Sequence, residues 1–171
     1  MRLIALDPGV GTGYAVFDAG ALHGVGTWRK DHANALGLLL TETPHSETLV
    51  YVEEPGTYGY HGRMKPRSHQ KLQQTIGLYL GVCSGFGVKA HTIPVSEWKG
   101  NEPKPRTRQR MLMLYGKVLG NMASSLDSNA FDALGLGHYM IGTLAFQARV
   151  EEATRNVRPR KAIRTERSVK S

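Results

Sequence analysis

Close to the start of the sequence, a short apolar segment runs directly into an acid and a tight turn. Residues 3–6 are all apolar, Asp7 follows them, and Pro8 precedes three glycines within the next five residues. This order predicts a buried strand that carries one carboxylate into a turn before a second strand departs. Burying an unpaired carboxylate costs several kcal/mol. Asp7 therefore either hydrogen-bonds the backbone of the turn or belongs to a functional site.

Length and charge indicate one domain with a polyanionic partner. The chain has 171 residues, and 22 Lys and Arg outnumber 14 Asp and Glu. Residues 153–171 alone contain seven basic residues and one acidic residue. Nucleic acid is the commonest partner of such a charge balance. We expect residues 1–150 to form the folded domain and residues 151–171 to form a basic tail that is flexible when free.

The sequence favours a protein of the cytoplasm, bacterial or viral in kind. Cys83 is the single cysteine, which excludes an intramolecular disulfide and indicates a small core residue. Asp7 interrupts the first apolar run, as a secretory signal would not allow. The longest apolar stretch, residues 131–146, contains Asp132 and His138 and is too short to span a bilayer. We expect no membrane partner.

The pattern of apolar residues predicts a mixed α/β fold. Strands are expected at residues 3–6, 13–18, 21–28, 48–55 and 88–95, the second and third forming a hairpin. Helices are expected at residues 31–40, 68–84, 107–118 and 129–146. Their predicted N-caps are Asp31, Ser68, Thr107 and either Asp127 or Ser128. The order predicts a mixed sheet, with three antiparallel strands followed by parallel strands, flanked by helices.

Three acids occupy comparable places in these elements. Asp7 and Glu53 each end a predicted core strand, and Asp132 lies in the first turns of a helix. They converge if the two strands are neighbours and the helix crosses their ends. Carboxylates that converge need cations, and oxygen ligands without a His or Cys cluster favour Mg²⁺ or Mn²⁺ over zinc. Two such ions would match the arrangement of two-metal nucleases.

The motifs around these acids resemble the RuvC family of Holliday junction resolvases, within the RNase H-like superfamily. The resemblance runs in the same order from residue 2 to residue 142 and rests on Leu6-Asp7-Pro8-Gly9, Val52-Glu53-Glu54 and Asp132-Ala133-Leu134. It implies an RNase H-like fold with Asp7, Glu53 and Asp132 as catalytic, metal-binding residues.

The resemblance also implies an activity and an assembly. The implied activity is that of a crossover junction endodeoxyribonuclease, which makes paired cuts in a four-way DNA junction and leaves 5′-phosphate ends. The implied cofactor is Mg²⁺, for which Mn²⁺ can substitute, and the implied assembly is a homodimer. The helix at residues 68–84 is the surface on which we expect the dimer. The family's fourth site position, which is commonly Asp or His, corresponds to Asn129, which brings an oxygen but no charge. Asp127 is the alternative fourth ligand, although a role as helix N-cap also fits it.

Basic and aromatic residues supply candidate DNA contacts. Side chains that could neutralise phosphates or stack on unpaired bases are Tyr58, Tyr60, Arg63, Lys65, Lys99, Lys104, Arg106 and Arg108. For the basic residues the alternative is a solvated face, and for the loop at residues 55–69 it is a disordered connection. Glu54 should point to the opposite face of the strand from Glu53. His69, His91 and His138 have no ligand spacing and indicate structural or surface histidines.

Three other functions remain open at this point. An RNase H-like nuclease could act on RNA or flap substrates, and a non-catalytic relative could bind branched DNA, which the asparagine at position 129 would favour. A phosphotransferase of the ASKHA superfamily also opens with a strand that ends in Asp-x-Gly, but it would need a second phosphate-binding loop and more length.

Overall fold

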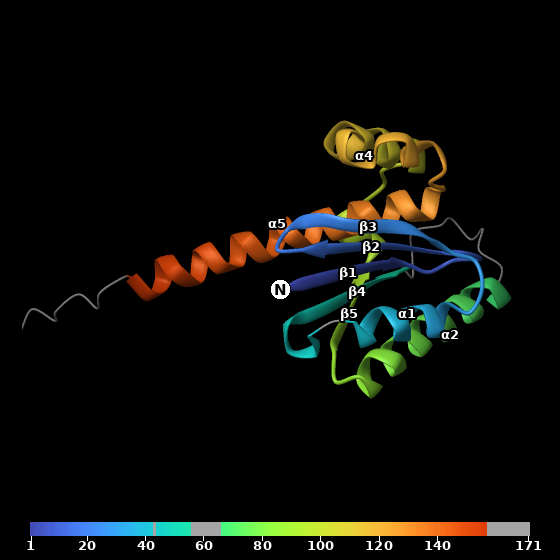
Figure 1. Ribbon diagram of the computed structural model, residues 1–171, viewed down its shortest axis with the longest axis horizontal. Coiled ribbons are helices and arrows are strands. Elements are labelled where there is room, and N and C mark those ends of the chain that lie inside the picture. The colour runs from blue at the N-terminus through green and yellow to red at the C-terminus, as the bar shows by residue number, and fades with distance from the viewer. Residues whose placement is uncertain (43, 56–65, 157–171) are drawn as a thin grey trace, which may run out of the picture.

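The computed structural model describes residues 1–42, 44–55 and 66–156, and a five-stranded mixed sheet lies at its centre (Figure 1). The strands are β1 (Arg2–Asp7), β2 (Thr12–Asp18), β3 (Ala21–Trp28), β4 (Thr48–Glu54) and β5 (Lys89–Pro94), in the spatial order β3-β2-β1-β4-β5. The first three strands pair antiparallel, whereas β4 runs parallel to β1 and β5 runs parallel to β4. The predicted fold class is confirmed.

The predicted hairpin connects β2 to β3 through a two-residue turn. Ala19 and Gly20 both have positive φ angles, 48° and 85°. Positive φ at both central residues defines the turn type that matches the twist of a two-residue hairpin.

Helices cover both faces of the sheet. In Figure 1, α1 (His32–Thr41) and α2 (Pro66–Gly85) lie on one face, α5 (Ser128–Asn156) crosses the other, and α4 (Lys104–Leu119) packs outside α5. The remaining elements are single turns: η1 (His45–Glu47), α3 (Val95–Trp98) and η2 (Gly120–Ser124). None of the helices in the described ranges is long and apolar enough to cross a membrane.

The alternation of side chains along the strands builds two separate cores. Ile4 and Leu6 of β1 pack with Val52, Leu36 and Ile76 under α1 and α2. Leu3 and Ala5 point to the opposite face and pack with residues of β2, α4 and α5, which include Phe17, Met111, Phe131 and Leu134. Asp7 and Glu53 continue the second alternation, so both acids belong to the face that α5 covers.

Three of the predicted helix caps are wrong. Asp31 directly precedes α1 but has left-handed backbone angles (φ 49°, ψ 41°) and makes no capping hydrogen bond, because a capping side chain needs an extended backbone. Ser68 lies inside α2, which begins at Pro66, since proline is favoured at the first helical position. Thr107 lies inside α4 for the same reason, as Pro105 permits an earlier start, and its hydroxyl donates to Glu102 Oε2.

The last helix has the predicted cap but a different end. Asp127 Oδ1 accepts hydrogen bonds from the backbone N–H groups of Asn129 and Ala130, at 3.1 and 3.0 Å, which confirms the N-cap interpretation of this residue. The helix continues to Asn156, ten residues beyond its predicted end and past the expected start of the tail. Residues 143–156 contain neither glycine nor proline, so nothing in their sequence ends a helix. Residues 157–171 of the expected tail lie outside the described residues.

Candidate active site

Parallel pairing of β1 with β4 brings Asp7 and Glu53 to the same edge of the sheet. Leu6 pairs with Val52, and each acid is the next residue of its strand. Asp7 is buried, with 5% of its surface exposed. Glu53 and Glu54 alternate across the strand as predicted, so only Glu53 faces α5.

The start of α5 places Asp132 against these two acids. Gly13 of β2 makes the close approach possible, because a Cβ atom at this position would lie 2.0 Å from the backbone oxygen of Asn129. Asp132 follows one turn later and is 1% exposed. The convergence of the three acids predicted from the sequence is therefore present in the fold.

Burial and mutual repulsion favour the protonated forms of two of the acids. Burial, followed by the charge of Glu53, raises the pKa of Asp7 well above its usual value. Burial, followed by the charge of Asp132, raises the pKa of Glu53 to about 7. Asp7 Oδ2 is buried without a hydrogen-bond partner. Additional positive charge would therefore stabilise the ionised forms of these carboxylates.

Two lysines supply part of that positive charge at Asp132. Lys99 Nζ lies 2.5 Å from Asp132 Oδ1, and its side chain is 6% exposed. Lys104 Nζ lies 3.1 Å from Asp132 Oδ2 and is half exposed. Burial lowers the pKa of Lys104, but the charges of Asp7 and Asp132 outweigh it and raise that pKa overall.

Asn129 and Asp127 have different surroundings at the start of α5. The Asn129 side chain donates from Nδ2 to the carbonyl oxygen of Gly11 at 2.7 Å and accepts at Oδ1 from Lys104 at 3.0 Å. Its amide oxygen therefore points toward the cluster. Asp127 Oδ1 accepts from the Thr27 hydroxyl at 2.6 Å as well as from the helix backbone, and these bonds outweigh burial and lower its pKa. The strongest charges that act on Asp7 are those of Glu53, Lys104, Asp132 and Lys99, and the strongest on Glu53 are those of Asp132 and the same two lysines.

One contact of the cluster had no signal in the sequence. Trp98, at the end of α3, donates its indole N–H to Glu53 Oε2 at 3.0 Å. The two residues are 45 positions apart, and no motif or spacing connects a tryptophan with a carboxylate on a neighbouring strand. Prediction of this bond would have required the parallel pairing of β4 with β5, whose register aligns Glu53 with Ile93.

The candidate DNA contacts divide into three groups. Lys99 and Lys104 join the carboxylate cluster. Arg106 and Arg108 lie exposed on the first turns of α4, where the Arg108 guanidinium sits 5.3 Å from the ring centroid of Phe131. The remaining candidates, Tyr58, Tyr60, Arg63 and Lys65, lie outside the described residues. Of the three histidines, His91 stacks on Tyr51 and His138 accepts or donates a hydrogen bond with Tyr115, as structural histidines do.

The donor atoms of the cluster suit a hard divalent cation. Three carboxylates and an amide oxygen are the ligands that Mg²⁺ and Mn²⁺ prefer. The buried Asp7 Oδ2 has no hydrogen-bond partner and could bind such an ion. Within the described part of the chain, no three acidic, His or Cys side chains are grouped closely enough to hold a metal ion as they stand. Each oxygen of Asp132 pairs with a lysine, so a metal ion at this carboxylate would compete with Lys99 and Lys104.

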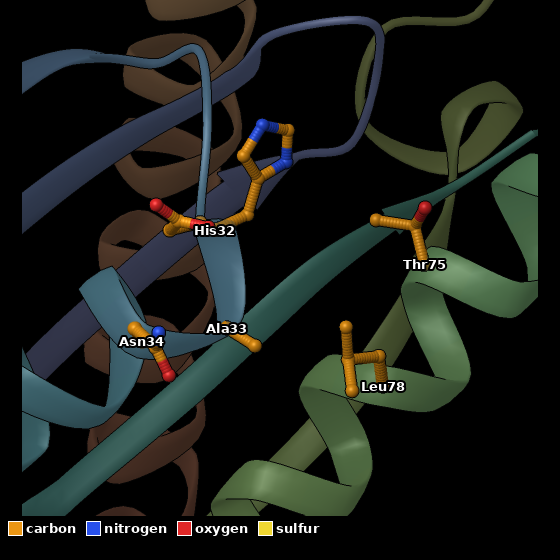
Figure 2. A pocket seen from close by; sticks show the side chains of 6 residues that line it. His32, Ala33, Asn34, Thr75 and Leu78 are labelled. Carbon is orange, nitrogen blue, oxygen red and sulfur yellow. The ribbon is translucent and has the colours of Figure 1, made fainter.

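A separate pocket of about 340 Å³ opens between the start of α1 and the middle of α2 (Figure 2). Its walls include His32, Asn34, Thr75 and Leu78. Behind it, the Thr12 hydroxyl shares hydrogen bonds with Tyr79 and His32, at 2.5 and 3.0 Å. This pocket lies on the α1 and α2 face of the sheet, whereas the acids lie on the α5 face.

The strand order, the mixed pairing and the acids at the edge of the first strand define an RNase H-like α/β fold. Within that class, the chain has the fold of RuvC-like Holliday junction resolvases. At the level of sequence, no family model and no curated protein matches the chain.

Two of the similar solved structures come from a bacterium and a virus. RuvC of Thermus thermophilus in complex with a Holliday junction substrate is 20% identical, with a TM-score of 0.58 over 88% of this chain and 96% of that chain. The Fowlpox virus resolvase in complex with Holliday junction DNA is 18% identical, with a TM-score of 0.52 over 81% of this chain and 98% of that chain. These likenesses confirm the fold implied by the sequence motifs.

Proposed function

We propose that this chain is a metal-dependent endonuclease that resolves four-way DNA junctions. The observation that carries the proposal is the convergence of Asp7, Glu53 and Asp132 at one edge of the sheet, with two lysines beside them. The fold shared with proteins solved on Holliday junction DNA supports the choice of substrate. Paired cuts, a homodimer, 5′-phosphate products and action in the cytoplasm are parts of the same proposal.

In this proposal, the residues of the cluster have different roles in phosphodiester hydrolysis. Asp7, Glu53 and Asp132 would hold Mg²⁺, or Mn²⁺ in its place, with Asn129 offering its amide oxygen. The ions would supply an activated water and charge stabilisation at the leaving oxygen. Lys99 and Lys104, once released from Asp132, would bind the scissile phosphate and stabilise its developing negative charge. Arg106 and Arg108 extend this positive surface along α4.

The deciding experiment is cleavage of a synthetic four-way junction in Mg²⁺. We expect paired nicks in the junction and none in a linear duplex or an RNA/DNA hybrid. Asp7→Asn should abolish cleavage and leave junction binding intact. Asp18→Asn is the matched control, because Asp18 pairs with Arg2 at the end of β1 and β2 that lies away from Asp7. We expect this variant to cleave like the wild type. Cleavage of the RNA strand or of flaps would favour another RNase H-like nuclease.

A second candidate function is favoured by one observation. Asn129 replaces a charged ligand and is held by Gly11 and Lys104, which also suits a non-catalytic protein that binds branched DNA. Junction binding without cleavage in either Mg²⁺ or Mn²⁺ would establish this second function.

A further inference from the structure

Trp98 links three parts of the carboxylate cluster through a single side chain. It ends α3, the short helix that follows β5, and only 6% of its surface is exposed. Its indole N–H donates to Glu53 Oε2 at 3.0 Å. An indole N–H is a donor only, so this bond fixes one oxygen of the carboxylate in a defined direction.

The indole ring is seated against the helix that carries Asp132. Gly135 lies one turn after Asp132, and a Cβ atom there would lie 2.7 Å from the ring of Trp98. The missing side chain at this position is therefore what lets the ring lie directly on α5. The ring thus sets the spacing between β4, which carries Glu53, and α5, which carries Asp132.

The same ring also lies beside the buried lysine. Lys99 Nζ is 5.4 Å from the centroid of the Trp98 ring, within the range of a cation–π contact, and bonds Asp132 at the same time. One aromatic side chain consequently touches Glu53, the backbone of α5 and the ammonium group that pairs with Asp132.

We propose that Trp98 is a positioning residue for the ion-binding carboxylates, which it orients through the bond to Glu53 and the packing against Gly135. This inference rests on the proposed function, because it concerns how the same cluster binds a divalent ion. Hydrogen-bond partners of metal ligands are typically responsible for a tenfold or larger part of metal affinity.

The test measures Mn²⁺ binding to the full-length protein without DNA, by the paramagnetic resonance signal of the free ion. Trp98→Phe keeps an aromatic ring but removes the N–H donor, and we expect Mn²⁺ affinity to fall by about tenfold or more. Trp28→Phe is the matched control. Trp28 stacks on Tyr14 with ring centroids 4.6 Å apart and packs against the core under α1 and α2, on the face of the sheet opposite the acids, so its replacement should leave the affinity unchanged.

A second replacement separates the lost bond from altered packing. Substituting benzothienylalanine at position 98 keeps the shape of the indole and replaces only its N–H with sulfur. We expect the same loss of Mn²⁺ affinity, with a folded protein by circular dichroism. Wild-type affinity in the benzothienylalanine protein would overturn the proposal, whatever the behaviour of Trp98→Phe.

The outcomes distinguish this inference from the proposed function. Weakened Mn²⁺ binding in both position-98 proteins, with no junction cleaved by the wild type, would refute the nuclease and leave the positioning role standing. Cleavage of junctions by a benzothienylalanine protein with unchanged Mn²⁺ affinity would support the nuclease and refute the positioning role. Absence of Mn²⁺ binding in the wild type would refute both.

Discussion

At the scale of single residues, the uncharged side chain of Asn129 leaves the cluster with three carboxylates and no fourth. Asn129→Asp adds a carboxylate beside Lys104, so we expect Mg²⁺ to half-saturate cleavage at a lower concentration. The same change removes the N–H donor to Gly11 and should lower the free energy of unfolding by about 1 kcal/mol. Urea denaturation and Mg²⁺ titration measure the two effects separately. Asn129→Ala should show the loss of stability without the gain in Mg²⁺ affinity, and equal affinities in both variants would contradict the prediction.

The raised pKa of Glu53 makes the metal-free protein sensitive to pH. The carboxyl binds its proton more tightly in the folded state, with a pKa of about 7 against 4.5 in the unfolded chain. Its contribution to stability is therefore complete below pH 4.5 and is lost as the pH rises toward 7. We expect Glu53→Gln to raise the free energy of unfolding at pH 8 by about 2 kcal/mol in EDTA, with little change at pH 4.

The control for this pH effect lies next to Glu53 in the chain. Glu54→Gln changes a carboxyl on the opposite face of β4 and should leave the difference between pH 4 and pH 8 as it is in the wild type. A Glu53→Gln protein with wild-type stability at both pH values would show that Glu53 is ionised without penalty. Addition of Mg²⁺ at pH 8 should stabilise the wild type more than Glu53→Gln, since the ion offsets the same repulsion.

At the scale of elements, β2 and α5 approach each other closely at Gly13. A Cβ atom on Gly13 would meet the backbone of Asn129, which cannot rotate away as a side chain could. Gly13→Ala should cost at least about 2 kcal/mol of unfolding free energy in urea denaturation. Gly24→Ala in β3 is the control, because nothing lies within 4 Å of its added Cβ, and it should be close to neutral. Equal stability of the two variants would show that α5 shifts without cost.

The elements that could be predicted from the sequence are those whose pattern is local. Short apolar runs and alternating residues predicted the strands of the sheet, and the apolar spacing of Leu36 and Leu40 predicted α1. The starts of α2 and α4 were misplaced because Ser and Thr favour caps on average, whereas here Ser68 and Thr107 lie inside helices whose first turns contain the prolines at positions 66 and 105. The end of α5 was missed because no residue there interrupts a helix.

In the candidate site, the three acids could be predicted from the sequence, whereas their bonding partners could not. Asp7, Glu53 and Asp132 could be identified because each stands at a recognisable place in a strand or helix. The bonds from Trp98 to Glu53 and from Lys99 to Asp132 could not, since they join residues 45 and 33 positions apart through the packing of β5 and α5 on the sheet. The basic character of Lys99 was a signal, but its specific partner was not.

At the scale of the whole molecule, the proposed homodimer requires a surface on which two copies of the chain can meet. Leu38 of α1 and Leu78 of α2 are 68% and 51% exposed, on the face of the sheet opposite the acids. They support the prediction that α2 forms the dimer surface. Leu78→Lys should give a monomer in light scattering and convert paired cuts into single nicks.

The control for the dimer surface is another exposed apolar residue. Val118 of α4 is 66% exposed, and Val118→Lys should leave both the oligomeric state and the paired cuts unchanged. A dimer that depends on Val118 and not on Leu78 would move the interface from α2 to α4.

In the proposed mechanism, a divalent ion that binds Asp132 would take the place of the two lysines that now pair with it. Lys99 and Lys104 together bring two positive charges, the same charge that one divalent ion carries. Such an ion would therefore replace, charge for charge, the two ammonium groups that pair with Asp132. Lys99 and Lys104, displaced from Asp132, would then lie near the ion and be available to bind an arriving phosphate. Binding of the metal ion would then, in the same step, free the two lysines to bind the nucleic acid.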